Sequence, residues 1–380
     1  MSAHQALGGR IFTKPFLVLL LIFVVGLVFM VERFSSGMGA VSNLNGGFAW
    51  GIWVVFDVVV GTAFACGGYA LAFMVYVFNK GQYHPLVRPA VLASLLGYAL
   101  GGFGAFFDMG RFWQFYEIFI PGNWNFNSVM LEVGLCVAVY IIILALEFAP
   151  AVLEKFGMHG LLKSLNKVLF FLIALGVLLP TMHQSSLGSL LIAMGHKVHP
   201  LWQVDHMQPV LALISALIMG FSIVIFEAST SAVGFSRKSE ASLLAKMRQV
   251  IIGLLSTFLI VRLLVLLVQG KLGLIFAADF ASLMILLETA LFAIPLVILL
   301  SPERSSRGSQ LLIAAMCMLM AGSLYRFDAF LLTFNPGPGY SYFPSAAEIM
   351  ITLGVVAFEI MAYLILVKTL PVLHREERAL

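Results

Sequence analysis

The sequence predicts an all-α polytopic membrane protein, with ten transmembrane helices in one integral membrane domain over residues 1–380. Of the 380 residues, 61% are apolar and only 11% are charged, whereas soluble domains are roughly 45–50% apolar and ~25% charged. The mean hydropathy is +1.02, and apolar runs of about 20 residues, long enough to cross a bilayer, recur along the chain. A soluble enzyme, a nucleic-acid-binding protein and a disordered tail are therefore excluded.

The apolar runs and their breaks place ten spans in order. The first run is too long for a cleavable signal peptide and ends in Glu32-Arg33, so we expect it to remain as a span. Glu132 in span four and Glu288 in span eight lie at similar depths, which suits two four-helix bundles, spans two to five and six to nine, flanked by spans one and ten. The expected spans are about 15–34, 48–78, 87–107, 126–150, 166–189, 208–232, 248–268, 279–300, 309–332 and 346–370.

The basic residues of the connections predict the orientation, because cytoplasmic loops carry an excess of Lys and Arg. One side holds only four, Arg33, Arg111, Lys197 and Lys271, whereas the side that carries both termini holds sixteen. This asymmetry predicts that both termini are cytoplasmic (N-in/C-in). The sixteen are Arg10, Lys14, Lys80, Arg88, Lys155, Lys163, Lys167, Arg237, Lys238, Lys246, Arg248, Arg304, Arg307, Lys368, Arg375 and Arg378.

The connections on the outer side are aromatic and weakly charged. Two examples cover about 108–125 and 333–345 and contain residues such as Trp113, Tyr116 and Tyr340. One interpretation is an aromatic belt at the membrane interface. The other is a docking surface for a partner protein, since these loops are longer than a belt requires.

The chain offers few ligands for metal chemistry. Cys66, Cys136 and Cys317 all lie within apolar runs without CxxC spacing and are interpreted as small buried residues, so iron–sulfur or nickel chemistry would lie in another chain. A membrane b-type haem needs two axial ligands, normally histidines, and His183 is the one histidine well inside an expected span. We therefore predict no haem and no metal in this chain.

Ionisable residues inside the spans are the main functional signal, because such groups are costly in a membrane. His183 approaches the outer end of span five, and Asp57 and Glu132 lie in the outer third of their spans. Glu227 lies about 28 Å along span six at ~1.5 Å per residue. Together they could relay protons; the alternative is structural pairing. The full set is Asp57, Glu132, Glu147, His183, Glu227, Arg262, Glu288, Arg326 and Glu359.

Structural pairing makes specific predictions of its own. Arg262 is expected to pair with Glu288, and Arg326 with Asp328 or Asp108. Glu147 and Glu359 are expected to pair with Lys or Arg near the interface. Glu132, His183 and Glu227 have no such obvious partner, which favours a functional role for them.

Several motifs carry a family resemblance. They resemble the membrane subunits of respiratory nickel–iron uptake hydrogenases of the HybB type and, more loosely, the wider NrfD/polysulfide-reductase membrane subunit family. The matches are spread over nearly the whole chain. They are LPTMHQSS at 179–186, YHPLVRP at 83–89, and residues 43–48, 145–150, 165–171, 199–202 and 219–227.

The resemblance implies a haem-free, quinone-interacting subunit of the bacterial inner membrane, with menaquinone as the electron acceptor. It implies partners as well: a periplasmic iron–sulfur electron-transfer subunit and the large and small subunits of the hydrogenase. By motif, the residues it associates with quinone and proton chemistry are Tyr98, Glu132, His183 and Glu227. Asp57 and Trp53 are further quinone-binding candidates from their position alone.

Two rival functions stay open. The chain could anchor a different reductase of the wider family, one acting on polysulfide, nitrite or a sulfoxide. It could also be a secondary transporter, a class that shares many spans, buried acids and internal repeats. Against the transporter, no spans show paired Gly/Pro breaks in matching halves at the midplane.

Overall fold

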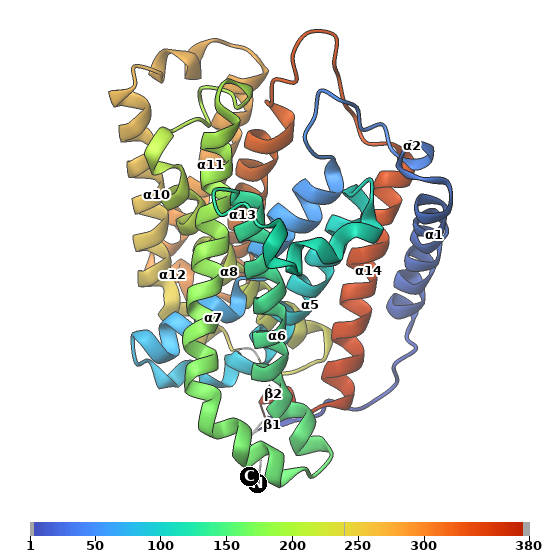
Figure 1. The fold of residues 1–380 in the computed structure, drawn as a ribbon. Coiled ribbons are helices and arrows are strands. Elements are labelled where there is room, and N and C mark those ends of the chain that lie inside the picture. Colours follow the sequence, from blue (N-terminus) through green and yellow to red (C-terminus); the bar gives the residue numbers. More distant parts are fainter. Residues whose placement is uncertain (1–3, 239, 375–380) are drawn as a thin grey trace. The chain divides into compact units, whose positions relative to one another are not determined.

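The computed structural model describes residues 4–238 and 240–374 and is helical almost throughout (Figure 1). Ten helices in the described chain are long and apolar enough to cross a membrane, which confirms the predicted number. Arg375 and Arg378, counted among the basic residues above, lie outside the described residues. The spans run over Lys14–Ser36, Trp53–Val77, Gly81–Asp108, Val129–Lys155, His159–Lys197, Asp205–Gly234, Ala241–Val268, Phe280–Leu300, Gly308–Leu332 and Ala346–Thr369.

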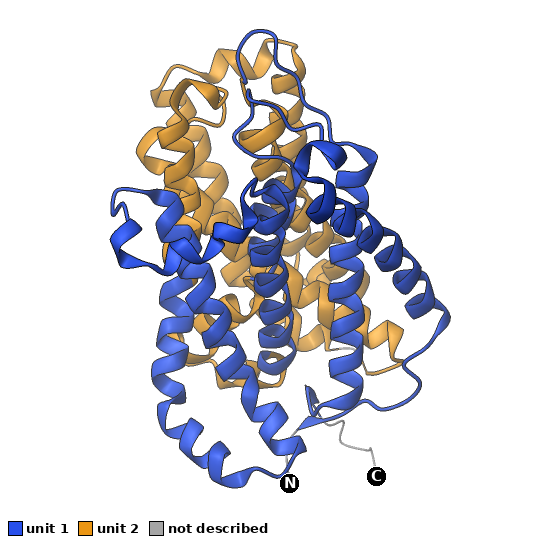
Figure 2. Cartoon of the chain, turned by 45° about the vertical axis from the view of Figure 1, so that its right-hand side comes forward, with its two compact units in different colours: residues 1–65, 87–179, 336–380 blue, residues 66–86, 180–335 orange. Residues whose placement is uncertain are grey.

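The helices form two compact units, shown in different colours in Figure 2. Unit 1 comprises Met1–Ala65, Val87–Leu179 and Pro336–Leu380, and unit 2 comprises Cys66–Leu86 and Pro180–Asn335. Spans six to nine fall together in unit 2, as one of the two expected bundles. Spans three and four instead fall with spans one and ten in unit 1, and spans two and five are divided between the units.

The regular elements have the following bounds. In unit 1 they are β1 (His4–Gln5), α1 (Lys14–Ser36), α2 (Met38–Val41), η1 (Trp53–Val60), α3 (Gly61–Phe64), most of α5 (His84–Asp108), η4 (Phe112–Phe119), η5 (Pro121–Asn123), α6 (Val129–Lys155), the first part of α7 (His159–Met194), α14 (Ala346–Thr369) and β2 (Leu373–His374). In unit 2 they are α4 (Gly67–Ala72), η2 (Phe73–Val77), η3 (Gly81–Tyr83), the rest of α7, η6 (Gly195–Lys197), η7 (Asp205–Met207), α8 (Gln208–Gly234), α9 (Ala241–Leu244), η8 (Ala245–Met247), α10 (Arg248–Val268), η9 (Leu272–Phe276), α11 (Phe280–Leu300), α12 (Pro302–Ser305), α13 (Gly308–Phe327) and η10 (Asp328–Leu332).

Span two is not the single regular helix expected over 48–78. It begins as the eight-residue π-helix η1, continues as the short α3, turns at Ala65-Cys66, and ends as α4 and the π-helix η2. The β-branched run in η1 and the glycines that follow it are weak α-helix formers, which explains the irregular backbone. π-Helical turns occur often at functional sites, and η1 carries two of the quinone-binding candidates, Trp53 and Asp57.

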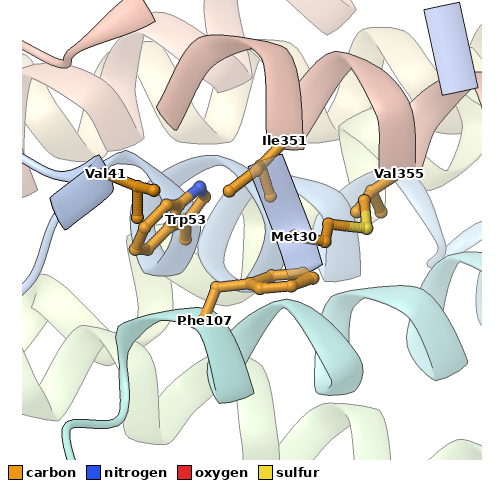
Figure 3. Packing of buried hydrophobic residues seen from close by; sticks show 6 residues of the cluster. All are labelled: Met30, Val41, Trp53, Phe107, Ile351 and Val355. Atoms are coloured by element: carbon orange, nitrogen blue, oxygen red, sulfur yellow. The ribbon is translucent and has the colours of Figure 1, made fainter. Parts of the chain in front are cut away.

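In unit 1, α1 packs along α14 at a point where both helices have a glycine. A Cβ on Gly26 would lie 2.7 Å from the Met350 carbonyl oxygen and 2.8 Å from the Gly354 Cα, so this close approach requires glycine. Beyond it, Met30, Trp53, Phe107 and Val355 belong to one buried apolar cluster (Figure 3). The cluster joins α1, η1, α5 and α14.

The two described ends of the chain meet in unit 1. β1 pairs antiparallel with β2, with His4 opposite His374 and Gln5 opposite Leu373. An even number of spans returns the chain to the side where it began, so this pairing fits ten spans. These two short strands lie outside the ten spans and are not expected from the hydropathy pattern.

In unit 2, α8 is the central helix, and α4, α10 and α13 all pack against it. Its Gly220 faces α4: a Cβ there would lie 2.4 Å from the Cys66 carbonyl oxygen. The side chain of Met219 fills the space above Gly322 of α13 in the same way. These close approaches are typical of small residues between membrane helices.

Candidate functional site

A buried ion pair lies in unit 2 between α10 and α11. Arg262 Nη1 lies 2.8 Å from Glu288 Oε1, and the Trp202 indole N–H donates to Glu288 Oε2 at 2.9 Å. The Arg262 guanidinium also lies 5.1 Å from the centroid of the Tyr325 ring. The predicted pair of Arg262 and Glu288 is confirmed, and the aromatic rings around it are ones that sequence reasoning missed.

Asp328 lies beside this pair and is fully buried where α13 passes into the π-helix η10. Neither of its carboxylate oxygens has a hydrogen-bond partner among the described residues, while Glu288 and Arg262 act on it electrostatically. A buried carboxyl group without hydrogen bonds is costly inside a membrane span, so Asp328 is a further candidate functional residue of unit 2.

His183 and Arg326 form a second polar group in unit 2. His183 is buried on α7 and within the electrostatic reach of Arg326. Arg326 donates to Gln184 Oε1 at 3.2 Å and to Ser215 Oγ at 3.1 Å. The predicted pairing of Arg326 with Asp328 is wrong, because neutral oxygens on α7 and α8 accept from the guanidinium instead. Asp108, the alternative partner, belongs to unit 1, where its Oδ2 accepts from the Gly51 N–H at 2.9 Å. The result is a cation held beside an imidazole.

A hydrogen-bonded pair of hydroxyl groups lies on α7 and α4, close to His183 along α7. The Tyr69 and Thr181 hydroxyls are 2.6 Å apart and belong to α4 and α7 of unit 2. Thr181 lies two residues before His183, in the motif that carried the family resemblance. The signal for Tyr69 was weak, because a tyrosine in an apolar span is ordinarily a packing residue.

Asp57 lies buried in unit 1, where η1 meets α5. A Cβ on Gly104 would lie 2.5 Å from the Asp57 Cβ and 3.0 Å from its Oδ2, so the glycine makes room for this carboxyl group. Asp57 Oδ2 has no hydrogen-bond partner in the described chain. Trp53, one helical turn earlier, is buried too and donates from its indole to the Glu348 carbonyl oxygen at 3.2 Å.

Two further acidic residues of unit 1 do not form the ion pairs predicted for them. Glu147 Oε1 is buried without a hydrogen-bond partner in the described chain and lies over Gly176 of α7, where a Cβ would be 2.4 Å away. Glu359 Oε1 lies over Gly97, 3.3 Å from a Cβ placed there. Neither glutamate forms an ion pair with Lys or Arg among the described residues, so the predicted pairing of both is wrong. Both lie against a helix face opened by a glycine instead.

The other predicted site residues differ in their surroundings. Tyr98 is fully buried, with its ring 4.6 Å from that of Tyr140 in an edge-on contact. Glu132 lies in the first turn of α6 and is exposed, while Glu288 is buried in the middle part of α11, so their predicted equivalence in depth is not seen. Glu227 is half-buried, far along α8.

The predicted residues are therefore distributed over both units. Trp53, Asp57, Tyr98 and Glu132 belong to unit 1, and His183 and Glu227 belong to unit 2. Within unit 1, Trp53 and Asp57 share the π-helix η1. Within unit 2, His183 of α7 lies with Arg326 of α13.

A polar network holds two connections together at one end of unit 1. Tyr342 donates its hydroxyl to Glu348 Oε1 at 2.5 Å and accepts from the Ile52 N–H at 3.0 Å. Glu348 Oε2 also accepts from the backbone N–H of Asn43 at 2.9 Å. Burial raises the pKa of the Tyr342 hydroxyl, and the hydrogen bond to Glu348 raises it further. The network fixes the loop before η1, and with it the position of Trp53.

The described residues contain no group of three or more His, Cys, Asp or Glu side chains placed to hold a metal ion. In the connection between spans five and six, His199 accepts from the Leu201 N–H at 3.3 Å and contacts the Trp202 ring edge-on. His199 therefore supports the loop that positions Trp202 over Glu288.

These features define a class: a polytopic helical membrane protein with fully buried charged groups and two spans that contain π-helical turns. The sequence narrows this class to one family. Residues 40–334 match the family described as polysulphide reductase, NrfD, and the chain belongs to that family.

Curated relatives extend this finding. The chain is 49% identical over 371 residues to the probable Ni/Fe-hydrogenase 2 b-type cytochrome subunit of Escherichia coli K12, covering 97% of this chain and 95% of that protein. It is 26% identical over 176 residues, 43% of this chain and 40% of the relative, to the integral membrane subunit of menaquinone reductase of Nitratidesulfovibrio vulgaris. It is 29% identical over 160 residues, 40% of this chain and 36% of the relative, to a selenate reductase subunit of Mesobacillus selenatarsenatis.

Proposed function

We propose that this chain is the quinone-reactive membrane subunit of a nickel–iron hydrogenase, passing electrons from a partner protein to menaquinone. The observation that carries the proposal is the 49% identity, over almost the full length of both chains, to the E. coli hydrogenase subunit. The relative named as a menaquinone reductase subunit supports the choice of quinone. The hydrogen-oxidising centre itself lies in the large and small hydrogenase subunits.

The proposed setting is the bacterial inner membrane with both termini in the cytoplasm. The excess of Lys and Arg on one side supports this orientation. A periplasmic iron–sulfur electron-transfer subunit then meets the opposite face, where the aromatic connections lie. In η4, Trp113 is 59% exposed and Tyr116 is 52% exposed. Large exposed aromatic side chains are typical anchors of protein interfaces.

Reducing a quinone to a quinol takes two electrons and two protons, so the subunit must supply protons as well as a binding site. Tyr98 and His183 are proposed to hydrogen-bond quinone oxygens, and Trp53 and Asp57 to line the binding region. Glu132 is proposed to donate a proton near the outer side, and Glu227 to supply protons from the cytoplasm. The burial of Tyr98, His183 and Asp57 supports these roles, since ionisable groups inside membrane spans usually serve proton or substrate paths.

Purification through an affinity tag on this chain tests the proposal. We expect the nickel–iron hydrogenase and an iron–sulfur protein to co-purify, and hydrogen to reduce menaquinone in the purified complex. Replacing Trp113 and Tyr116 together by Ala should release these partners, because it removes two exposed anchors while leaving the spans unchanged. Hydrogen oxidation with an artificial dye should persist in the released enzyme.

Leu21→Ala is the matched control, because Leu21 is an exposed apolar residue on α1, away from the aromatic connections. It should leave the complex intact. Retention of all partners by the double Ala variant would remove the outer aromatic connections as the docking surface. A complex without hydrogenase would overturn the proposed function itself.

We also propose that this chain binds no haem, although the name of its E. coli relative includes a b-type cytochrome. Among the described histidines, His183 is the one deep within a span, and the others lie near span ends, in a connection or in β1 and β2. A two-histidine haem site therefore lacks a second ligand at that depth. The absorption spectrum of the purified, dithionite-reduced chain should show no haem α-band, and a band at one haem per chain would refute this.

A second candidate function is the same role in a different reductase. The relationship to a selenate reductase subunit and the description of the family support it. The same purification distinguishes the two, because the catalytic partner would then be a reductase for another substrate rather than a hydrogenase.

A further inference from the structure

Unit 1 contains an apolar cavity between α1, α5 and α14. Its volume is about 580 Å³, within the ~300–1,000 Å³ range of small-molecule sites. Val31, Phe103 and Phe358 belong to its lining and are also exposed on the membrane-facing surface. A molecule dissolved in the bilayer could therefore enter the cavity from the side. The lining residues are Phe23, Leu27, Met30, Val31, Phe34, Ser35, Leu100, Phe103, Val355 and Phe358.

Two contacts hold α1 in place where it lines this cavity. The close approach of Gly26 to Gly354 fixes α1 against α14. Further along α1, the buried Arg33 donates to the carbonyl oxygens of Phe107 at 2.7 Å and Met109 at 2.8 Å, at the end of α5. The α1 lining runs from Phe23 to Ser35 and so includes both contact points, which makes the cavity part of the packing of unit 1.

The chemistry of the lining selects a hydrocarbon chain over a polar head group. Ser35 supplies the one polar side chain, and its hydroxyl donates to the Glu32 carbonyl oxygen at 3.3 Å. The other nine side chains are apolar, and four of them are phenylalanine rings. A quinone ring held here would leave its carbonyl oxygens without donors, which is unfavourable.

The cavity adjoins the buried cluster that contains Trp53, one of the quinone-binding candidates. Met30 and Val355 line it and also belong to the buried cluster that contains Trp53 and Phe107 (Figure 3). Trp53 lies in the same π-helix as Asp57. A chain lying in the cavity therefore contacts side chains that pack in one cluster with Trp53.

We propose that this cavity binds the isoprenoid chain of the quinone, and that α1 and α14 thereby select quinones by their side chain. This inference rests on the proposed function of quinone reduction. Each isoprenoid unit contains a double bond that does not rotate, so the chain has fewer rotatable bonds to fix in a preformed cavity than a saturated acyl chain of the same length. Phenylalanine rings also offer flat surfaces to its double bonds.

The test compares two variants of α1 that differ only in position. Val31 and Val28 are each 61% exposed, but only Val31 lines the cavity. Val31→Trp places a large ring at the cavity mouth, and Val28→Trp places the same ring elsewhere on the membrane-facing surface. Leu27→Trp, from a second lining position, repeats the occlusion. Initial rates of hydrogen-dependent reduction are measured with menaquinone and with an analogue of the same ring that lacks the chain.

We expect Val31→Trp and Leu27→Trp to raise KM for menaquinone by about tenfold or more, while kcat and KM for the chainless analogue stay unchanged. A tenfold change corresponds to about 1.4 kcal/mol of binding. Val28→Trp should change neither KM. Quinone that co-purifies with the complex should fall in the two occluded variants.

The remaining outcomes overturn the proposal in distinguishable ways. Equal loss of both quinones would mean that the rings disturb the redox site instead of a chain-binding cavity. No change with either quinone, or loss of a co-purifying phospholipid alone, would assign the cavity to lipid packing. A wild-type complex that reduces neither quinone would refute the proposed function, independently of the cavity.

Discussion

Replacing Arg262 by Met is expected to destabilise the protein by about 3–5 kcal/mol, the usual cost of removing one partner of a buried ion pair. The change leaves Glu288 as an uncompensated carboxylate in the interior of unit 2, where both partners are almost fully buried. It also removes the cation that faces the Tyr325 ring. Loss of thermal stability in detergent, followed for the isolated chain, measures this cost.

The double variant Arg262→Met with Glu288→Gln separates charge from packing. Gln keeps an oxygen that can accept from the Trp202 indole N–H, so the hydrogen bond seen in the structure is preserved. With no charge left unpaired, we expect most of the lost stability to return. If the double variant is as unstable as the single one, packing around Arg262 carries the stability and the ion pair does not.

Arg307→Met provides the matched surface control. Arg307 pairs with Glu303 as Arg262 pairs with Glu288, but both side chains of the Arg307–Glu303 pair are largely exposed. Surface ion pairs contribute roughly 0–1 kcal/mol, so this variant should unfold like the wild type. A large effect here would show that the assay does not report on burial.

The number of spans was predictable because hydrophobic length is a direct physical requirement of the bilayer. Span five shows the limit of that reasoning. The expected helix covered 166–189, whereas α7 begins at His159 and has 36 residues, because the polar Lys163 and Lys167 do not stop a helix that continues beyond the hydrocarbon region. Hydropathy indicates which residues cross the hydrocarbon region, whereas the ends of a helix depend on local hydrogen bonds.

Ionisable residues inside spans were equally predictable, but their partners were not. The pair of Arg262 and Glu288 followed from opposite charges in neighbouring spans. The surroundings of Glu147 and Glu359 could not be predicted from charge, because each lies over a glycine of another helix instead of beside a basic residue. The position of Asp57 depended likewise on the π-helical backbone of η1, which no apolar run reveals.

The second large effect is expected on turnover, from replacing Glu132 and Glu227, which are proposed to act at different steps of proton transfer. Glu132→Gln should abolish hydrogen-to-menaquinone turnover while the complex stays assembled and quinone still binds. Gln keeps the shape and hydrogen bonding of Glu but cannot release a proton, and losing a general acid typically costs a factor of about 10²–10⁴. The exposure of Glu132 in the first turn of α6 argues that its replacement leaves folding intact.

Glu227→Gln should slow turnover through proton supply and leave quinone affinity almost unchanged. Glu227 lies about 28 Å from the start of α8 at ~1.5 Å per residue, far from the outer end where the quinone is proposed to bind. Raising the proton concentration should partly restore turnover in this variant, since supply limits it, whereas Glu132→Gln should not respond.

Glu303→Gln is the control for both, because Glu303 is an exposed acid in a surface ion pair. Complex yield, quinone affinity and turnover are measured together in all three variants. Near-normal turnover in Glu132→Gln and Glu227→Gln would exclude a relay through these acids. Loss of assembly in both would assign them structural roles instead. Loss of quinone affinity in Glu227→Gln would place that residue at the binding site and refute the separation of supply from donation.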